Sequence, residues 1–192
     1  MKHHLPAVLL LAAGCMSTVQ TMREGKPTPP PGPDEAKVVV YRSSAFGGID
    51  HFPIYEYMNG DGKLMGVTET DCYFEYRCPP GKHFFLTWGE GDAFIEATLD
   101  AGKTYYIQAW SKFGIISSRP GFGPVGKDSE AMKELRAAWP RLRCREIDPA
   151  DVTYVETRDE ARLQKAREAY EAGSKSAKFL RPEDGLPEPL GR

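Results

Sequence analysis

The sequence predicts a mainly β protein: an antiparallel β-sandwich of about seven strands, with one covering helix and a C-terminal helix. Segments with apolar residues at every second position recur roughly 8 to 12 residues apart between residues 36 and 112. Glycine-rich turns separate these segments, and a helical pattern follows over residues 128–139. The 192 residues suit one folded domain, because 41% hydrophobic and 27% charged residues are typical of a globular chain.

Residues 1–14 have the features of a secretory signal peptide. Lys2 gives a positive start, residues 5–13 are mainly apolar, and small residues precede Cys15. The apolar run is interrupted by Pro6 and has about half of the ~20 residues that a transmembrane helix needs. We therefore expect a cleaved signal rather than a membrane span.

The end of this segment, Leu11-Ala12-Ala13-Gly14-Cys15, resembles the lipobox of bacterial lipoproteins. The resemblance implies cleavage before Cys15, diacylglycerol on its sulfur and a fatty acyl group such as palmitate on the new N-terminus. Met16 follows, and by analogy lipoproteins without Asp at this position go to the outer membrane and face the periplasm. Ordinary secretion with cleavage after Gly14 is the alternative.

Residues 15–35 are expected to form a lipidated, proline-rich tether. The prolines between residues 27 and 33 lack an amide proton and fix φ, so this segment favours extended polyproline II at about 3.1 Å per residue. Such a tether would hold the folded domain up to roughly 60 Å from the membrane.

The sandwich domain is expected over residues 36–148. Its first strand is apolar on both faces, as in a strand buried between layers. Asn59-Gly60-Asp61-Gly62 and Pro80-Gly81 are turn signals, because their residues accept positive φ. The expected strands are 36–42, 52–58, 63–67, 72–78, 83–88, 93–99 and 103–110.

Two helices are expected after these strands. Residues 114–127 are rich in glycine and proline and predict a loop, followed by a helix over 128–139 that covers part of the sheet. A short edge strand over 142–147 carries Cys144. Within residues 149–192, a capping box at Thr157 and Glu160 predicts a second helix, and the prolines beyond residue 173 predict a disordered end.

Five short motifs occur in a fixed order: V-V-Y-R ending at Arg42, K-L-M-G at 63–66, C-Y-F at 72–74, P-G-K-H at 80–83 and A-G-K-T-Y-Y at 101–106. Together they resemble the bacterial domain of unknown function 2846 family over about residues 36–138. The resemblance implies a lipoprotein with a small β-sandwich. It implies no reaction, cofactor or catalytic residue.

The three cysteines after Cys15 suit an oxidising compartment. Cys72 and Cys78 cannot pair if they end one strand, since six residues span about 20 Å and a disulfide needs Cα atoms within about 7 Å. We expect a disulfide from Cys144 to Cys72 or Cys78, with three buried thiols as the alternative.

Several function classes lack their usual signals. The formal net charge of −2 offers no basic field for nucleic acid. The sequence has no G-x-S-x-G or H-E-x-x-H motif, and Cys72, Cys78, His83 and Cys144 lack the spacing of a zinc finger. We expect no catalytic residues, metal or cofactor, with a hydrolase as the less favoured alternative, and a hydrogen-bonding role for His83.

The expected function is therefore a non-catalytic binding or scaffolding module of the cell envelope, anchored to the membrane through the lipid on Cys15. Its expected partner is an envelope protein or peptidoglycan. A glycan platform would use exposed aromatic rings, for which Trp88, Trp110, Tyr55 and Tyr57 are the candidates. The alternative for these four rings is a place in the core.

Overall fold

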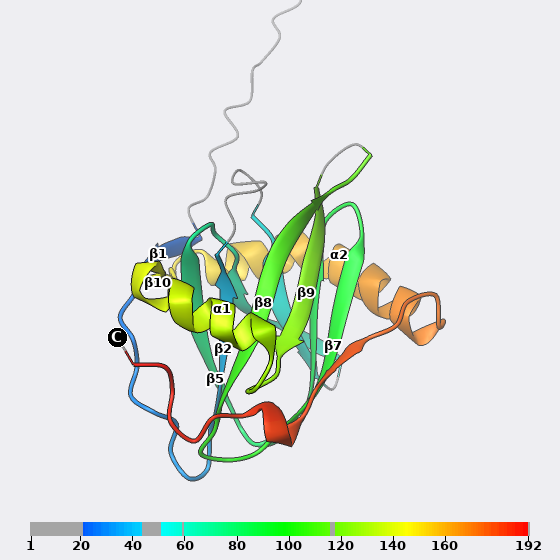
Figure 1. Cartoon of the computed structure of the whole chain (residues 1–192). Coiled ribbons are helices and arrows are strands. Elements are labelled where there is room, and N and C mark those ends of the chain that lie inside the picture. Colours follow the sequence, from blue (N-terminus) through cyan, green and yellow to red (C-terminus); the bar gives the residue numbers. More distant parts are fainter. Residues whose placement is uncertain (1–20, 44–50, 59, 116–117, 192) are drawn as a thin grey trace, which may run out of the picture.

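The computed structural model describes residues 21–43, 51–58, 60–115 and 118–191, which form a mainly β fold of two sheets with two α-helices (Figure 1). This agrees with the predicted class. The predicted signal peptide and Cys15 lie outside the described residues. The described residues contain eleven strands, so the expected count of about seven is wrong.

The first sheet has six strands in the order β1-β10-β5-β2-β8-β9, and the second has five in the order β11-β7-β6-β3-β4. In the first sheet the bounds are β1 Met22–Glu24, β10 Arg143–Ile147, β5 Cys72–Cys78, β2 Ala36–Arg42, β8 Thr104–Phe113 and β9 Ser118–Val125. In the second they are β11 Lys178–Leu180, β7 Asp92–Leu99, β6 Gly81–Trp88, β3 Pro53–Met58 and β4 Asp61–Val67.

Both sheets are mixed rather than purely antiparallel, which corrects the prediction. The pairs β2 with β8, β10 with β5, and β11 with β7 are parallel. Period-two patterning shows where a strand lies along the chain but not the direction of its neighbour. Parallel neighbours need long crossover connections, and here whole hairpins and helices serve as those connections.

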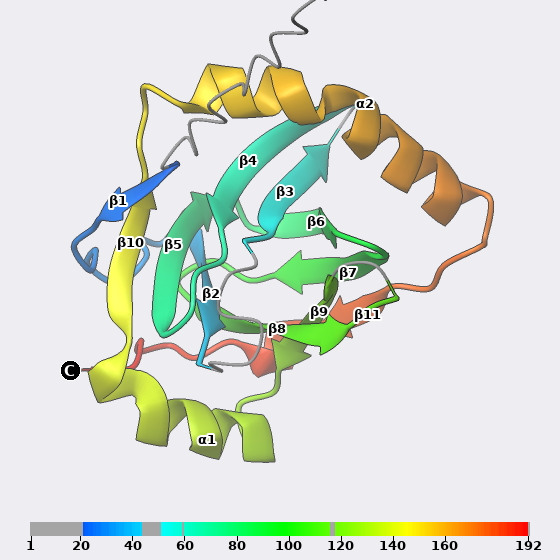
Figure 2. The ribbon, with the colours of Figure 1, turned by 90° about the horizontal axis from the view of Figure 1, so that it is seen from above.

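A shared core joins the inner faces of the two sheets, as expected of a sandwich. Val38, Val40 and Ile107 of the first sheet pack in one buried cluster with Phe85 and Ile95 of the second. The outer faces are apolar as well, and helices cover them (Figure 2). Strand β2 is consequently buried along its entire length.

Helix α1 (Glu130–Ala138) lies on the outer face of the six-stranded sheet, close to the predicted bounds. The Ser129 side chain, rather than Asp128, caps it by accepting a hydrogen bond from the Met132 amide. Pro140 follows in a 3₁₀ turn, η1 (Trp139–Arg141). Met132 and Leu135 are buried on the sheet, which is the covering role predicted for this helix.

Helix α2 (Val152–Glu171) begins five residues before the predicted capping box. The earlier start adds Val155 to the buried face that Leu163 and Ala166 form against the five-stranded sheet. The apolar face of α2 is thus already covered by its own domain.

Strand β9 lies where the sequence predicted a loop. Pro120 and Pro124 cannot donate ladder hydrogen bonds, but β9 is an edge strand, where proline is tolerated. Its glycines make room for a ring on β8: a Cβ at Gly121 would lie 1.8 Å from Nε1 of Trp110. Glycines that usually indicate a loop here make room for the side chain of Trp110 within a strand.

The proline-rich segment is fastened to the domain, which corrects the expected tether. Strand β1 pairs with β10 from Met22 onward. Beyond it, the Thr28 amide donates to Glu75 at 2.8 Å, and Arg77 donates to the Pro29 carbonyl at 2.6 Å. The buried Lys37 ammonium donates to the Thr28 carbonyl at 2.9 Å. These polar groups on β2 and β5 hold the segment against the sheet.

The C-terminal segment is also ordered, contrary to the expectation. Strand β11 pairs with β7 and buries Leu180 in the shared core. A 3₁₀ turn, η2 (Pro182–Asp184), follows, and Leu186 exchanges two backbone hydrogen bonds with Thr104. The segment completes the second sheet along β7.

Replacing Leu180 tests whether this segment belongs to the core. Leu180→Ala is expected to lower the free energy of unfolding by about 2–5 kcal/mol, because it removes a buried side chain and leaves a cavity in the core. The neighbouring Phe179 is 57% exposed, so Phe179→Ala is expected to cost less than about 1 kcal/mol. Urea unfolding measures both, and equal losses would contradict the placement of β11.

Candidate functional site

Three of the four candidate aromatic rings are core residues. Tyr55, Tyr57 and Trp88 lie on the outer face of the five-stranded sheet beneath α2, and all three are buried. The Tyr55 and Trp88 rings stack with centroids 5.1 Å apart, and the Tyr55 hydroxyl donates to Asp159 of α2 at 3.1 Å. These three rings therefore belong to the core, which was the alternative that the sequence left open, and they form no exposed platform.

Trp110 alone stays half-exposed, on the outer face of β8. Gly121 and Gly123 of β9 face it without side chains, and the indole lies across both of them. The Lys178 ammonium lies over the ring, 4.4 Å from its centroid, and Lys112 approaches at 5.9 Å. Trp110 is therefore held flat by backbone on one side and flanked by two cations.

Trp110 forms part of an open groove between β8–β9 and the C-terminal segment, which we call the β11 groove. Its volume is about 610 Å³. Its lining includes Trp110 and Phe179, the cations Lys178 and Arg181, and the acids Glu183 and Asp184. Sequence analysis found Trp110 but missed the groove, because one wall comes from the segment expected to be disordered.

The charges around Trp110 favour an anionic ligand. Burial against its neighbours, together with the charge of Lys112, lowers the pKa of Lys178. Among the described residues, no carboxylate lies within ion-pair distance of either lysine. At the far end, Arg181 lies 3.9 Å from Glu183, a loose and exposed pair. Two cations without acidic partners beside a flat ring are suited to bind a negatively charged group.

A second polar cluster is buried between the sheets. Glu56 of β3 accepts hydrogen bonds from Tyr76 of β5 and from Nδ1 of His83 of β6, and Nε2 of His83 donates to the Pro79 carbonyl at 2.9 Å. Burial alone would lower the pKa of His83, but hydrogen bonds with Cys78 and Glu56 outweigh it and raise the pKa to about 10. Burial alone would raise the pKa of Glu56, but its two hydrogen bonds lower it.

This cluster is arranged as a structural ion pair. Both His83 nitrogens donate to oxygen acceptors, so the ring carries a positive charge at neutral pH and has no lone pair to accept a proton from a nucleophile. The expected hydrogen-bonding role of His83 agrees with these contacts. Sequence patterns did not indicate Glu56 and Tyr76 as the other members, because these residues come from two other strands.

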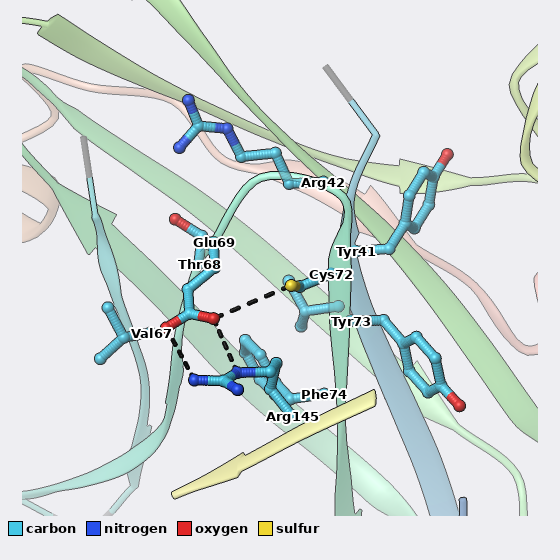
Figure 3. Close-up of a pocket in the computed structure, with 10 residues that line it drawn as sticks. Tyr41, Arg42, Val67, Thr68, Glu69, Cys72, Tyr73, Phe74 and Arg145 are labelled. Carbon is cyan, nitrogen blue, oxygen red and sulfur yellow. Dashed lines mark hydrogen bonds and ion pairs between the residues drawn. The ribbon is translucent and has the colours of Figure 1, made fainter. Parts of the chain in front are cut away.

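A small pocket at one end of the six-stranded sheet has Cys72 and two arginines in its wall (Figure 3). Glu69 pairs with Arg145 at 2.7 Å and accepts from the Cys72 thiol at 3.8 Å. Figure 3 shows the Arg42 side chain directed away from this pair, and its guanidinium donates to Ser111 at 2.9 Å. The pocket has no room for a water-sized molecule, so its polar groups serve the fold.

Cys72, Cys78 and Cys144 are buried thiols, so the expected disulfide from Cys144 to Cys72 or Cys78 is not formed. Cys144 is paired with Tyr73 in the β10–β5 register and shares its face. Cys72 and Cys78 are separated from Tyr73 by odd numbers of residues, so both lie on the opposite face. A strand exposes alternate residues on opposite faces, which excludes either disulfide without a change of register.

The described residues contain no group of three or more His, Cys, Asp or Glu side chains placed to hold a metal ion. No helix within the described ranges is both long and apolar enough to cross a membrane.

The buried ion pair predicts a pH dependence of stability. The folded-state pKa of His83 lies above its unfolded value of about 6.5, so its contribution is present below that pH and is lost as pH rises toward about 10. The Glu56 contribution is lost as pH falls below the unfolded value near 4.3. The pair is expected to contribute most between these two unfolded values.

Urea unfolding across this range provides the measurement. His83→Ala is expected to lower the free energy of unfolding by about 3–5 kcal/mol near pH 6, because it leaves a buried carboxylate unpaired. It is also expected to reduce the fall in that free energy between pH 6.5 and 10. His51 is exposed, so His51→Ala serves as the matched histidine control and should leave both unchanged. An unchanged decline in His83→Ala would contradict the assignment.

Comparison with known proteins identifies no relative: the chain matches no protein-family model, no curated protein and no solved structure.

Proposed function

We propose that this protein is a non-catalytic binding module of the bacterial cell envelope, lipid-anchored through Cys15 at the outer membrane and facing the periplasm. We further propose that its β11 groove binds an acidic glycan, namely peptidoglycan, which this location supplies. Membership of the domain of unknown function 2846 family remains part of the proposal, resting on the five motifs. The observation that carries the ligand class is Trp110 with its two lysines.

The groove offers what a charged saccharide requires. An aromatic face packs against the apolar face of a sugar ring, and Trp110 is fixed flat by Gly121 and Gly123 before any ligand arrives. Lys178 lies over the ring and Lys112 approaches it, and both bring charges that carboxylates can pair with. Peptidoglycan has both groups, because its sugars carry peptides that end in carboxylates.

Binding fits the described side chains better than catalysis does. Both ring nitrogens of His83 carry a proton, and the pocket of about 320 Å³ beside His83 shares Phe179 and Arg181 with the β11 groove. Burial, with a further contribution from Glu69, raises the pKa of the Cys72 thiol, which therefore stays protonated and poorly nucleophilic. Neither group supplies an activated nucleophile.

An envelope protein is the other partner that the sequence suggested. Its recognition through α2 would require an unpartnered apolar helix face. Val155, Leu163 and Ala166 are buried on the five-stranded sheet instead. The glycan interpretation is therefore the one we favour.

Co-sedimentation of the lipidated protein, kept in detergent, with purified peptidoglycan tests the ligand. Trp110→Ala and Lys178→Glu are each expected to weaken binding about tenfold, which corresponds to about 1.4 kcal/mol. Lys175 is exposed and lies outside the groove, so Lys175→Glu makes the same change in net charge and should bind as the original protein does. Thermal unfolding confirms that each variant is folded.

If Lys175→Glu weakened peptidoglycan binding as much as Lys178→Glu does, the loss would come from net charge and not from the groove. Failure of the original protein to sediment, or undiminished binding by Trp110→Ala, would refute a glycan site in the β11 groove.

A further inference from the structure

The path from the proposed anchor to the domain is short. Strand β1 begins at Met22, and the proline-rich segment beyond it is bound to the sheet. Only the seven peptide steps from Cys15 to Met22 can therefore separate the lipid from the domain. At about 3.3–3.6 Å for each step, the reach is at most about 25 Å, which is less than half of the tether length that the sequence suggested.

The β8–β9 hairpin carries the most exposed large apolar side chains of the described residues. Phe113 is 83% exposed and Ile115 is 87% exposed. Figure 1 shows this hairpin extending beyond the other strands at the upper edge of the molecule, the edge at which β1 also lies. The hairpin and the start of β1 thus lie at the same end of the molecule.

The hairpin is held in this position by the neighbouring turn between β6 and β7. Glu90 of that turn accepts a hydrogen bond from the Ile115 amide at 2.7 Å and pairs with Arg119 at 3.1 Å. The Glu90 amide donates to the Ser118 carbonyl at 3.2 Å. These contacts fasten the base of the hairpin to the β6–β7 turn, and Arg119 offsets the charge of Glu90.

The side chains behind the tip are those that membrane interfaces favour. Lys112 and Arg119 flank the apolar pair, and Lys and Arg pair with anionic headgroups. The hairpin thus has apolar side chains at its tip and cations behind them, as a segment that enters a lipid surface requires.

We infer that the β8–β9 hairpin inserts Phe113 and Ile115 into the lipid surface that holds the anchor, so that the domain rests directly against the membrane. This inference rests on the proposed lipid anchor. It adds a second membrane contact, and two contacts together fix the orientation of the domain, which a flexible anchor alone would leave free.

Tryptophan fluorescence in vesicles tests the insertion. The full lipidated protein is reconstituted into vesicles of phosphatidylethanolamine and phosphatidylglycerol, with or without bromine on the acyl chains. Phe113→Trp is the probe, and Phe179→Trp on β11 is the control, since Phe179 is also exposed but lies away from the hairpin. The emission of the unchanged protein is subtracted from both. Phe113→Trp is expected to shift to the blue and to lose at least half of its added emission to bromine, and Phe179→Trp to do neither.

The outcomes separate the inference from the anchor. Flotation of the vesicles comes first: a protein that stays behind lacks the anchor, and both proposals fall. A protein that floats while Phe113→Trp is quenched no more than Phe179→Trp retains its anchor, and the insertion alone is refuted. A blue shift of Phe113→Trp that needs no lipid and grows with protein concentration would assign the tip to a contact between proteins and would also overturn the insertion.

Discussion

The burial of strand β2 on both faces is the constraint on which the other layers depend. Val38 and Val40 face the core between the sheets, whereas Val39 and Tyr41 face outward. An outward apolar face must be covered, and α1 covers it through Met132, Leu135 and the following Trp139. The five-stranded sheet has the same need, which α2 meets above Tyr55 and Trp88. The helices are therefore layers of the domain rather than appendages.

The sequence allowed the strands to be predicted wherever alternation was undisturbed, as in 72–78 and 93–99, and α1 wherever the helical period was clear. The sequence was misleading where the role of a residue depends on a partner that is distant in the chain. Gly121 indicated a loop because its role, making room for the Trp110 ring, depends on a strand adjacent in space. The prolines near residue 30 indicated a free tether because they cannot join a helix or a sheet. Carbonyls and an amide of this segment find partners on β2 and β5, which the local sequence does not reveal.

The candidate site was harder to predict for a related reason. Period two identifies which rings share a face, but not whether a helix later covers that face, so Tyr57 and Trp110 looked equivalent in sequence. The disulfide failed similarly: the prediction rested on distance along one strand, whereas the decisive fact is that β10 adds beside β5 with Cys144 facing outward. Both errors concern how separate elements are placed, which local patterns do not encode.

The C-terminal segment connects the fold to the proposed function. It has too few apolar residues to fold by itself, yet Leu180 fills the core and Lys178 reaches Trp110 from the same three-residue strand. Lys178 and Leu180 are two residues apart and share a face of β11, so burial of Leu180 in the core also fixes the backbone that carries Lys178. The wall of the β11 groove is therefore ordered together with the core. That rigidity suits a binding site, since a wall that is ordered beforehand needs no ordering when a ligand binds.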